Sequence, residues 1–193
     1  MNYMLAIGTG GVIALIAVAL VLVIVFWYIG TMNRLRQIDL KVQEAESGID
    51  VALTKRFDTL TKLLETTKGY AKHESETLQN VIKWRNGIPA NATLKDKEEF
   101  LGQLDKVASG INVVVEQYPQ LKADTIFKEL QVAVTNTEEH LQAARRLYNA
   151  NVTQLNTIIV TFPQSIVANA IHMEKRPYFE AEEKKRQDVE FKF

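Results

Sequence analysis

The sequence predicts an all-α protein in which one membrane-spanning helix precedes a four-helix-bundle-like domain, an antiparallel bundle of three long helices plus a short C-terminal helix. Residues 1–33 contain no charged side chain, and all 23 basic and 23 acidic residues lie from Arg34 onward. In most of the remaining chain, apolar residues recur every three to four positions, which is typical of amphipathic helices. We therefore divide the chain into an anchor over 1–32, a bundle over 33–172 and a flexible charged tail over 173–193.

The first element is the almost wholly apolar run from Leu5 to Ile29. About 20 helical residues cross a hydrocarbon core of ~30 Å, so this run is long enough to span a membrane. A cleaved signal peptide is the alternative, although its apolar core is usually only about 7–15 residues long. Because Arg34, Arg36 and Lys41 follow the span, the positive-inside rule places the N-terminus outside and the main domain in the cytoplasm. We expect a single-pass protein of the cytoplasmic (inner) membrane.

Two small residues of the span, Gly10 and Ala14, lie four positions apart. A pair of this kind lets two helices approach closely in lipid, which favours a homo-oligomer. Small residues are also common in membrane helices that do not associate. The expected partners of this segment are therefore membrane lipid and a second copy of the chain.

The first long helix is expected over residues 33–85, because apolar residues follow one stripe and no proline interrupts them. Such a helix can continue directly from the membrane span. Asn86, Gly87 and Pro89 then supply turn chemistry that ends it.

Two further long helices and one short helix complete the bundle. The second begins after Thr93, a favourable N-cap residue, and ends at Pro119. The third carries an apolar stripe over residues 127–162, spaced as in a coiled coil, and Pro163 closes it. A short apolar helix follows over 165–171. Each apolar stripe needs a partner, and antiparallel packing with short connections is the simplest arrangement.

Several segments after the anchor are distinctive: LETTKGYAKHESETL, EQYPQLKADTIFKELQ, TEEHLQAARRLYNANVTQLNTIIVTFP and PYFEAEE. Together they resemble the LemA family of bacterial membrane proteins. The resemblance implies a helical bundle on a single-pass anchor and members that work as scaffolds or accessory proteins, often associated with membrane metalloproteases. The family usually carries tryptophan and proline where this chain has Glu46 and Thr61.

No motif for catalysis, cofactor binding or metal binding is complete. His73 and Glu74 begin a zincin-like pattern, but Thr77 stands where the second histidine is required. The other histidines, His140 and His172, are distant in sequence, and the chain has no cysteine. We therefore expect no enzyme activity, no cofactor and no metal. A formal net charge of +0 also argues against a nucleic-acid partner.

Lys68, Gly69, Tyr70 and His73 form one candidate interaction or packing site. A glycine inside a helix costs about 1 kcal/mol relative to alanine, which indicates a reason for its presence. Close packing of a neighbouring element is one reason, and a notch for a partner is the other. His73 would be a surface residue or a buried hydrogen-bonding residue.

Arg145, Tyr148 and Asn149 form a second candidate site within slightly more than one helical turn. Residues spaced by three and four share one helix face. These side chains would clamp the first long helix or form an exposed recognition surface.

The last five residues alternate apolar and charged side chains. Val189, Phe191 and Phe193 would share one face of an extended strand, while Glu190 and Lys192 would share the other. Either this tail docks onto its own bundle or a neighbour, or it is a frayed end.

These observations favour a non-catalytic scaffold or adaptor that acts at the membrane by self-assembly and protein–protein interaction. One alternative is a ligand sensor or enzyme with a site in a groove between helices, and another is a structural protein that shapes membranes. A pocket lined by convergent ionisable groups would favour the sensor or enzyme.

Overall fold

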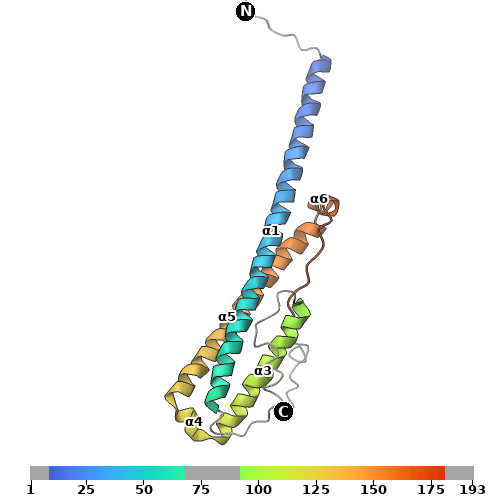
Figure 1. Cartoon of the computed structure of the whole chain (residues 1–193). Helices are drawn as coiled ribbons and strands as arrows, with labels where there is room; N and C mark the ends of the chain where they lie inside the picture. The colour runs from blue at the N-terminus through green and yellow to red at the C-terminus, as the bar shows by residue number, and fades with distance from the viewer. Residues whose placement is uncertain (1–8, 68–91, 181–193) are drawn as a thin grey trace, which may run out of the picture. The chain divides into compact units, whose positions relative to one another are not determined.

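The computed structural model describes residues 9–67 and 92–180 (Figure 1). Every regular element in these ranges is an α-helix, which confirms the all-α prediction. The helices are α1 (Thr9–Thr67), α3 (Leu94–Gln117), α4 (Pro119–Ala123), α5 (Thr125–Val160) and α6 (Gln164–Ala170).

The chain divides into two compact units. Unit 1 contains Met1–Lys41 and Val152–Arg176, and unit 2 contains Val42–Asn151 and Pro177–Phe193. Both α1 and α5 pass from one unit into the other, so each unit is built from segments that are far apart in the sequence.

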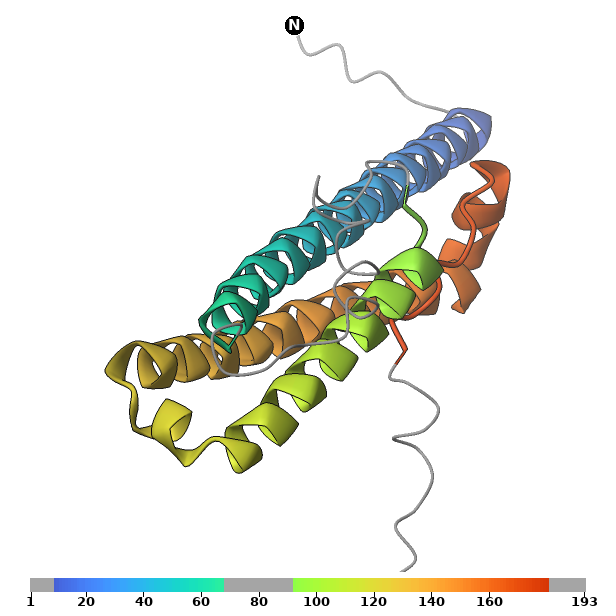
Figure 2. The same cartoon turned by 60° about the horizontal axis from the view of Figure 1, so that its bottom comes forward.

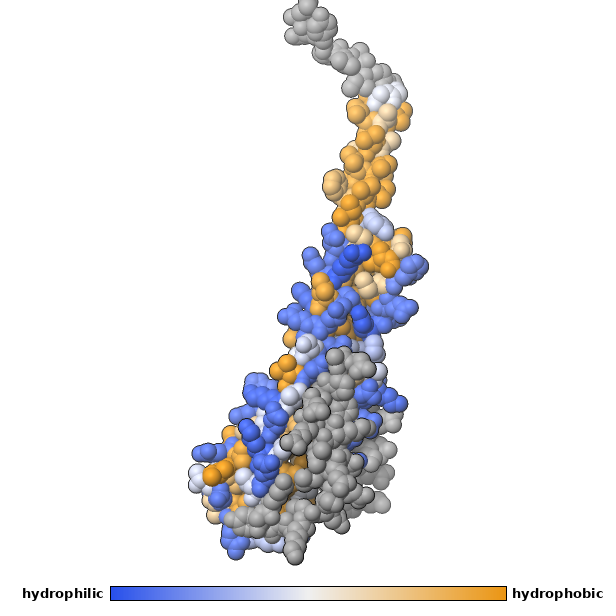
Figure 3. Space-filling model, viewed as in Figure 1, coloured by the Kyte–Doolittle hydropathy of each residue, from blue (hydrophilic) through white to orange (hydrophobic). Residues whose placement is uncertain are grey.

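Helix α1 joins the apolar span to the first bundle helix without a break. Among the described helices, it is the one long and apolar enough to cross a membrane. Its apolar part is the orange stretch of Figure 3. The predicted end of this helix at residue 85 lies outside the described residues.

In unit 2, the C-terminal half of α1 packs with α3, α4 and the first part of α5. Phe100 and Leu104 of α3 are buried, and the ring centroids of Phe57 and Phe100 lie 6.0 Å apart. Other fully buried core residues come from α1, α4 and α5: Ile49, Leu53, Leu60, Leu121, Phe127 and Leu141. The predicted apolar stripes therefore form one core, whose burial drives the packing of the bundle.

Ion pairs between α1 and α3 define the direction of these helices. Lys97 contacts Glu46 and Asp50, while Arg56 contacts Asp105, so residue numbers rise together along both helices. Helix α4 then reverses the chain, and α5 runs antiparallel to both (Figure 2). The antiparallel arrangement therefore applies to α5, whereas α1 and α3 run in the same direction.

Local capping sets the ends of the unit 2 helices. Thr93 and Asp96 form a capping box at the start of α3, which confirms Thr93 as its N-cap. Pro119 ends α3 and begins α4, since proline lacks the N–H that a helix interior needs. The Asp124 side chain accepts a hydrogen bond of 2.9 Å from the Phe127 N–H and so caps the first turn of α5.

In unit 1, the end of α5 and the short helix α6 pack beside α1 (Figures 1 and 2). The buried apolar residues are Leu35 and Ile38 of α1 with Val152, Leu155, Ile158, Ile159, Val167 and Ala168. Helix α6 ends where His172 adopts a positive φ of 52°. The Met173 N–H then donates to the Ala168 carbonyl, which satisfies a terminal carbonyl of the helix.

Candidate functional site

The candidate site is the place in unit 2 where residues 177–180 lie against α5. Asn149 donates from Nδ2 to the carbonyl of Phe179 at 3.0 Å and accepts at Oδ1 from the N–H of the same residue at 2.8 Å. Tyr148 donates from Oη to the carbonyl of Pro177 at 3.0 Å. These contacts satisfy backbone groups as a neighbouring β-strand would, although the partner is a helix face.

Phe179 anchors this segment through its side chain. It is only 2 % exposed, and the Arg145 guanidinium lies 4.9 Å from the centre of its ring. A cation over an aromatic face is favourable by about 0.5–2 kcal/mol, depending on its desolvation. Arg145 also donates to the Glu180 carbonyl at 3.1 Å, and the Glu180 N–H donates to Glu98 of α3 at 2.6 Å. The segment is therefore held by two helices.

The helical spacing of α5 explains how its side chains reach one extended segment. Arg145, Tyr148 and Asn149 are separated by three and four residues and hence share a face. The structure brings these three predicted residues together, and their hydrogen bonds run to residues 177–180. We expected these side chains to clamp the first long helix or to form an exposed recognition surface, whereas the structure places them against residues 177–180. The sequence carries no signal for this partner, because Phe179 lies about thirty residues further along the chain.

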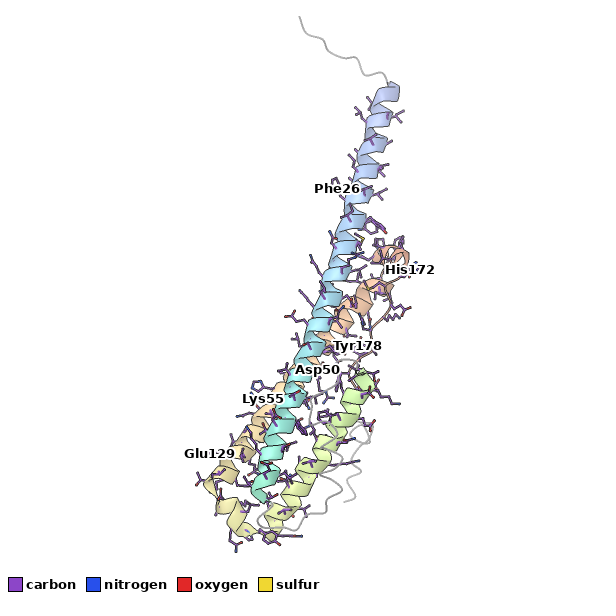
Figure 4. The ribbon with its side chains drawn as sticks, viewed as in Figure 1. Phe26, Asp50, Lys55, Glu129, His172 and Tyr178 are labelled. Atoms are coloured by element: carbon purple, nitrogen blue, oxygen red, sulfur yellow. The ribbon has the colours of Figure 1, made fainter. Side chains whose placement is uncertain are left out.

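An open groove of about 490 Å³ lies beside the segment. Tyr178, labelled in Figure 4, is 45 % exposed at its edge. The groove is lined by Gln142, Arg145, Arg146, Asn149, Tyr178, Phe179 and Glu180. Guanidinium and amide donors of this kind suit carboxylate groups and peptide carbonyls.

The electrostatics of the groove centre on Arg145. Desolvation by burial lowers the pKa of its guanidinium, while the negative charges of Glu138, Asp105 and Glu98 oppose that effect. An arginine remains charged at neutral pH despite such a decrease. Arg145 can therefore bind the ring and the carbonyl oxygen as a cation.

Two buried cations hold the helices that support the site. Arg56, 4 % exposed, lies 2.7 Å from both Asp105 and Glu138, so it connects α1 with α3 and α5. Removing one partner of a buried ion pair leaves the other charge uncompensated, which is the costly change.

Lys97 is the second buried cation, with Nζ 2.9 Å from Glu46 and 2.8 Å from Asp50. Burial by itself would lower the pKa of Lys97, but hydrogen bonds and charge attraction from Asp50 and Glu46 outweigh it and raise that pKa. Glu46 is therefore part of an interhelical ion pair.

A similar asparagine contact occurs within unit 1. Asn156 donates to the Arg176 carbonyl at 2.9 Å and accepts from the Arg176 N–H at 2.9 Å. The guanidinium of Arg176 lies 2.9 Å from Asp39 of α1. The same side-chain chemistry therefore holds the extended backbone on α5 in each unit.

The remaining predicted site residues are not gathered at this site. Gly10 and Ala14 are exposed on α1, and the space around Gly10 is open. His140 and His172 are exposed. Within residues 9–67 and 92–180, no cluster of three or more His, Asp or Glu side chains is suited to a metal ion. The other predicted residues lie outside the described ranges: Lys68, Gly69, Tyr70, His73, Val189, Phe191 and Phe193.

A family model and a curated relative are both similar to this chain. The sequence model of the LemA family matches residues 45–193, a range that includes most of the bundle and the segment over 177–180. The chain is also similar to Protein LemA of Metamycoplasma hominis. The two are 30 % identical over 166 residues, which cover 86 % of this chain and 76 % of that protein.

Proposed function

The chain belongs to the LemA family, and from this premise we propose that it is a non-catalytic, membrane-anchored scaffold or adaptor. The observation that carries the proposal is the continuity of α1. This helix passes from an apolar span long enough to cross a membrane into the buried core of unit 2 without an intervening linker. Such a helix connects a folded interaction domain directly to its anchor.

The chemistry of unit 2 supports an adaptor rather than an enzyme. The polar groups beside the apolar stripe of α5 bind backbone atoms and an aromatic ring, and the buried cations bind carboxylates between helices. General acid–base catalysis instead needs a proton donor or acceptor placed to reach a reacting group, with a suitable pKa. The groups described here hold segments of the fold together, which suits a binding protein.

Topology and assembly form part of the proposal. Arg34 and Arg36 are exposed directly after the span, which supports a cytoplasmic bundle in the cell membrane. The exposed Gly10 and Ala14 support self-association through the span. Other membrane proteins, such as a membrane metalloprotease, are further candidate partners.

A ligand sensor is the second candidate function, and the groove beside Tyr178 is the observation that favours it. Arg145 and Arg146 converge there with one carboxylate, Glu180. A small anionic molecule would fit this chemistry. Its binding would be measured by native mass spectrometry of the full chain in detergent.

Site-specific photocrosslinking in membranes tests the adaptor proposal. A photoreactive amino acid replaces Arg146 at the groove and, as a control, exposed Val51 on α1. We expect defined protein adducts from position 146 that are absent from position 51, and mass spectrometry distinguishes a second copy from another membrane protein. Equal labelling at both positions, with a small molecule retained by the purified protein, would favour the sensor instead.

A further inference from the structure

The corner between α5 and α6 in unit 1 exposes an unusual apolar surface. Phe162 is 77 % exposed, and Val160 and Ile166 are each 56 % exposed. These residues follow one another closely through the end of α5, the turn and α6. Three large, exposed apolar side chains within seven residues suit a contact with a partner or a membrane.

The corner belongs to a second stretch of the chain that carries no formal charge. No Asp, Glu, Lys or Arg occurs over residues 147–173, and charges resume at Glu174, Lys175 and Arg176. The first charge-free stretch, over 1–33, contains the membrane span and ends at Arg34. Both stretches contribute to unit 1.

The burial pattern of α1 shows where the corner packs. The large apolar side chains from Val12 to Trp27 are exposed, whereas Thr31 is only 8 % exposed and Leu35 is fully buried. The rest of unit 1 is Val152–Arg176, so this segment packs on α1 where its exposed apolar surface ends. Figure 1 shows α6 beside this part of α1, and Figure 3 shows apolar surface there.

General helix and bilayer dimensions are compatible with a corner that reaches the bilayer surface. A helix rises 1.5 Å per residue, so Thr31 lies only about 3 Å beyond Ile29, the last apolar residue of the span. Packed helices have axes about 8–10 Å apart, and the interfacial layer of one leaflet is roughly 5–8 Å thick. In Figure 4, His172 at the end of α6 lies beside the part of α1 that follows Phe26, and both belong to unit 1.

We infer that the α5–α6 corner is a second membrane contact, in which Phe162, Val160 and Ile166 enter the interfacial layer of the leaflet from which α1 emerges. The inference rests on the proposed membrane anchor and adds a monotopic element to it. Interfacial elements bury apolar side chains about 5–10 Å into the headgroup and acyl boundary. Arg34 and Lys175, both exposed at the ends of the charge-free stretches, would face the headgroups.

The lipid surface explains this corner better than another protein does. Its exposed apolar side chains lie in the same unit as the apolar span. The membrane that surrounds the span can therefore also cover the corner. Two points of attachment would also fix the orientation of unit 1 on the bilayer. A single helix leaves rotation about its own axis free.

Single-cysteine labelling of the full chain tests the inference, because the chain has no cysteine of its own. A fluorophore is attached at Ile166→Cys or Phe162→Cys in phosphatidylcholine–phosphatidylglycerol vesicles, and quenching by a spin-labelled lipid is compared with quenching by aqueous iodide. Val18→Cys reports on the span. Val132→Cys, on α5 in unit 2, is the matched control because it is 60 % exposed.

We expect the spin-labelled lipid to reduce the fluorescence at positions 166 and 162 nearly as much as at position 18. The same quencher should reduce the fluorescence at position 132 only slightly. If 166 and 162 behave like 132 while 18 is quenched by lipid, the corner inference is wrong and the anchor stands. Protection from both quenchers at 166 and 162 would show that protein covers the corner, which also overturns the inference. If the lipid quencher has no effect at position 18, the proposed membrane anchor is wrong. Lipid quenching at position 166 would then show by itself whether the corner contacts the membrane. Far-UV circular dichroism confirms that each variant is folded.

Discussion

At the scale of single residues, Asn149 binds the backbone of Phe179 with both ends of its amide. A buried backbone N–H or carbonyl that loses its partner is costly, whereas a satisfied one contributes modestly. We therefore expect Asn149 to contribute strongly to holding residues 177–180 on α5. Arg145 adds the contact with the Phe179 ring, and Glu98 accepts from the N–H of Glu180, so the site depends on a few side chains.

The change Asn149→Leu should release the segment over 177–180. Leucine keeps a similar volume but leaves the N–H and carbonyl of Phe179 without these partners, at a cost of about 1–3 kcal/mol. Hydrogen exchange measured by mass spectrometry should show faster exchange in a peptide that covers this segment. The matched control is Gln154→Leu, an exposed position on the same helix, which should leave that exchange unchanged. Equal exchange in both variants would contradict a clamping role for Asn149.

Lys97 should make the stability of the bundle depend on alkaline pH. Its folded pKa is raised above the ordinary value of 10.5, so its stabilising contribution is complete below pH 10.5 and is lost as the pH rises through the folded pKa. Lys97→Met should cost about 1–3 kcal/mol near pH 8, because the carboxylates of Glu46 and Asp50 lose their cation and are partly solvated.

Urea unfolding of the full chain in detergent, at pH 8 and at pH 11, tests whether the contribution of Lys97 to stability depends on pH. The difference in unfolding free energy between wild type and Lys97→Met should narrow at the higher pH. Lys95→Met is the control, since Lys95 is exposed on the same helix and should change stability little at either pH. A difference that stays constant would mean that the ion pair does not stabilise the fold.

At the scale of secondary-structure elements, α5 contributes to both units, and its faces differ in burial and polarity. Leu141 and Leu155 are fully buried on its inner side, whereas Leu147 is 58 % exposed. The apolar stripe supplies the packing energy, and the adjacent polar face binds the C-terminal segment. Helix α5 therefore both contributes to the core and binds the extended segment over 177–180.

Leu141→Ala should destabilise the bundle by about 2–5 kcal/mol, because truncation of a buried leucine removes transfer energy and leaves a cavity. Leu147→Ala makes the same chemical change on the same helix at an exposed position, and we expect a cost of no more than about 0.5 kcal/mol. Thermal or urea unfolding by circular dichroism compares the two. Similar costs for both would mean that α5 packs through a different face.

At the scale of the whole molecule, function depends on which side of the membrane holds the bundle and on whether copies associate. The charge distribution supports a cytoplasmic bundle, with exposed Arg34 and Arg36 directly after the span. A protease added to intact spheroplasts should therefore leave the bundle uncut, and detergent lysis should make it susceptible. Digestion in intact spheroplasts would reverse the orientation.

Self-association should depend on the small-residue face of the span. Gly10→Ile combined with Ala14→Ile should weaken a homo-oligomer, because larger side chains prevent close approach of two helices in lipid. Light scattering of the detergent-solubilised chain measures the assembly, and Val12→Leu with Ile16→Leu is the control pair on exposed positions of the same helix. A wild type that is strictly monomeric would rule out the oligomer.

Much of the fold could be predicted from the sequence because its signals are local. The charge-free run predicts the span, the spacing of apolar residues predicts the long helices, and Thr93, Pro119 and Pro163 mark helix ends. The cluster of Arg145, Tyr148 and Asn149 was also predictable, since helical spacing places the three on one face. Its partner was not, because Phe179 follows them by about thirty residues with no pattern that links the two.

The sequence by itself determined that this chain is an apolar helix followed by amphipathic helices, since periodicity and helix-breaking residues act over one or two turns. Only the tertiary structure decided the contacts between distant segments. It buried Lys97 and Arg56 among carboxylates of neighbouring helices and placed Phe179 on α5. A local pattern shows that a side chain needs a partner, but the packing of the whole core determines which partner it meets.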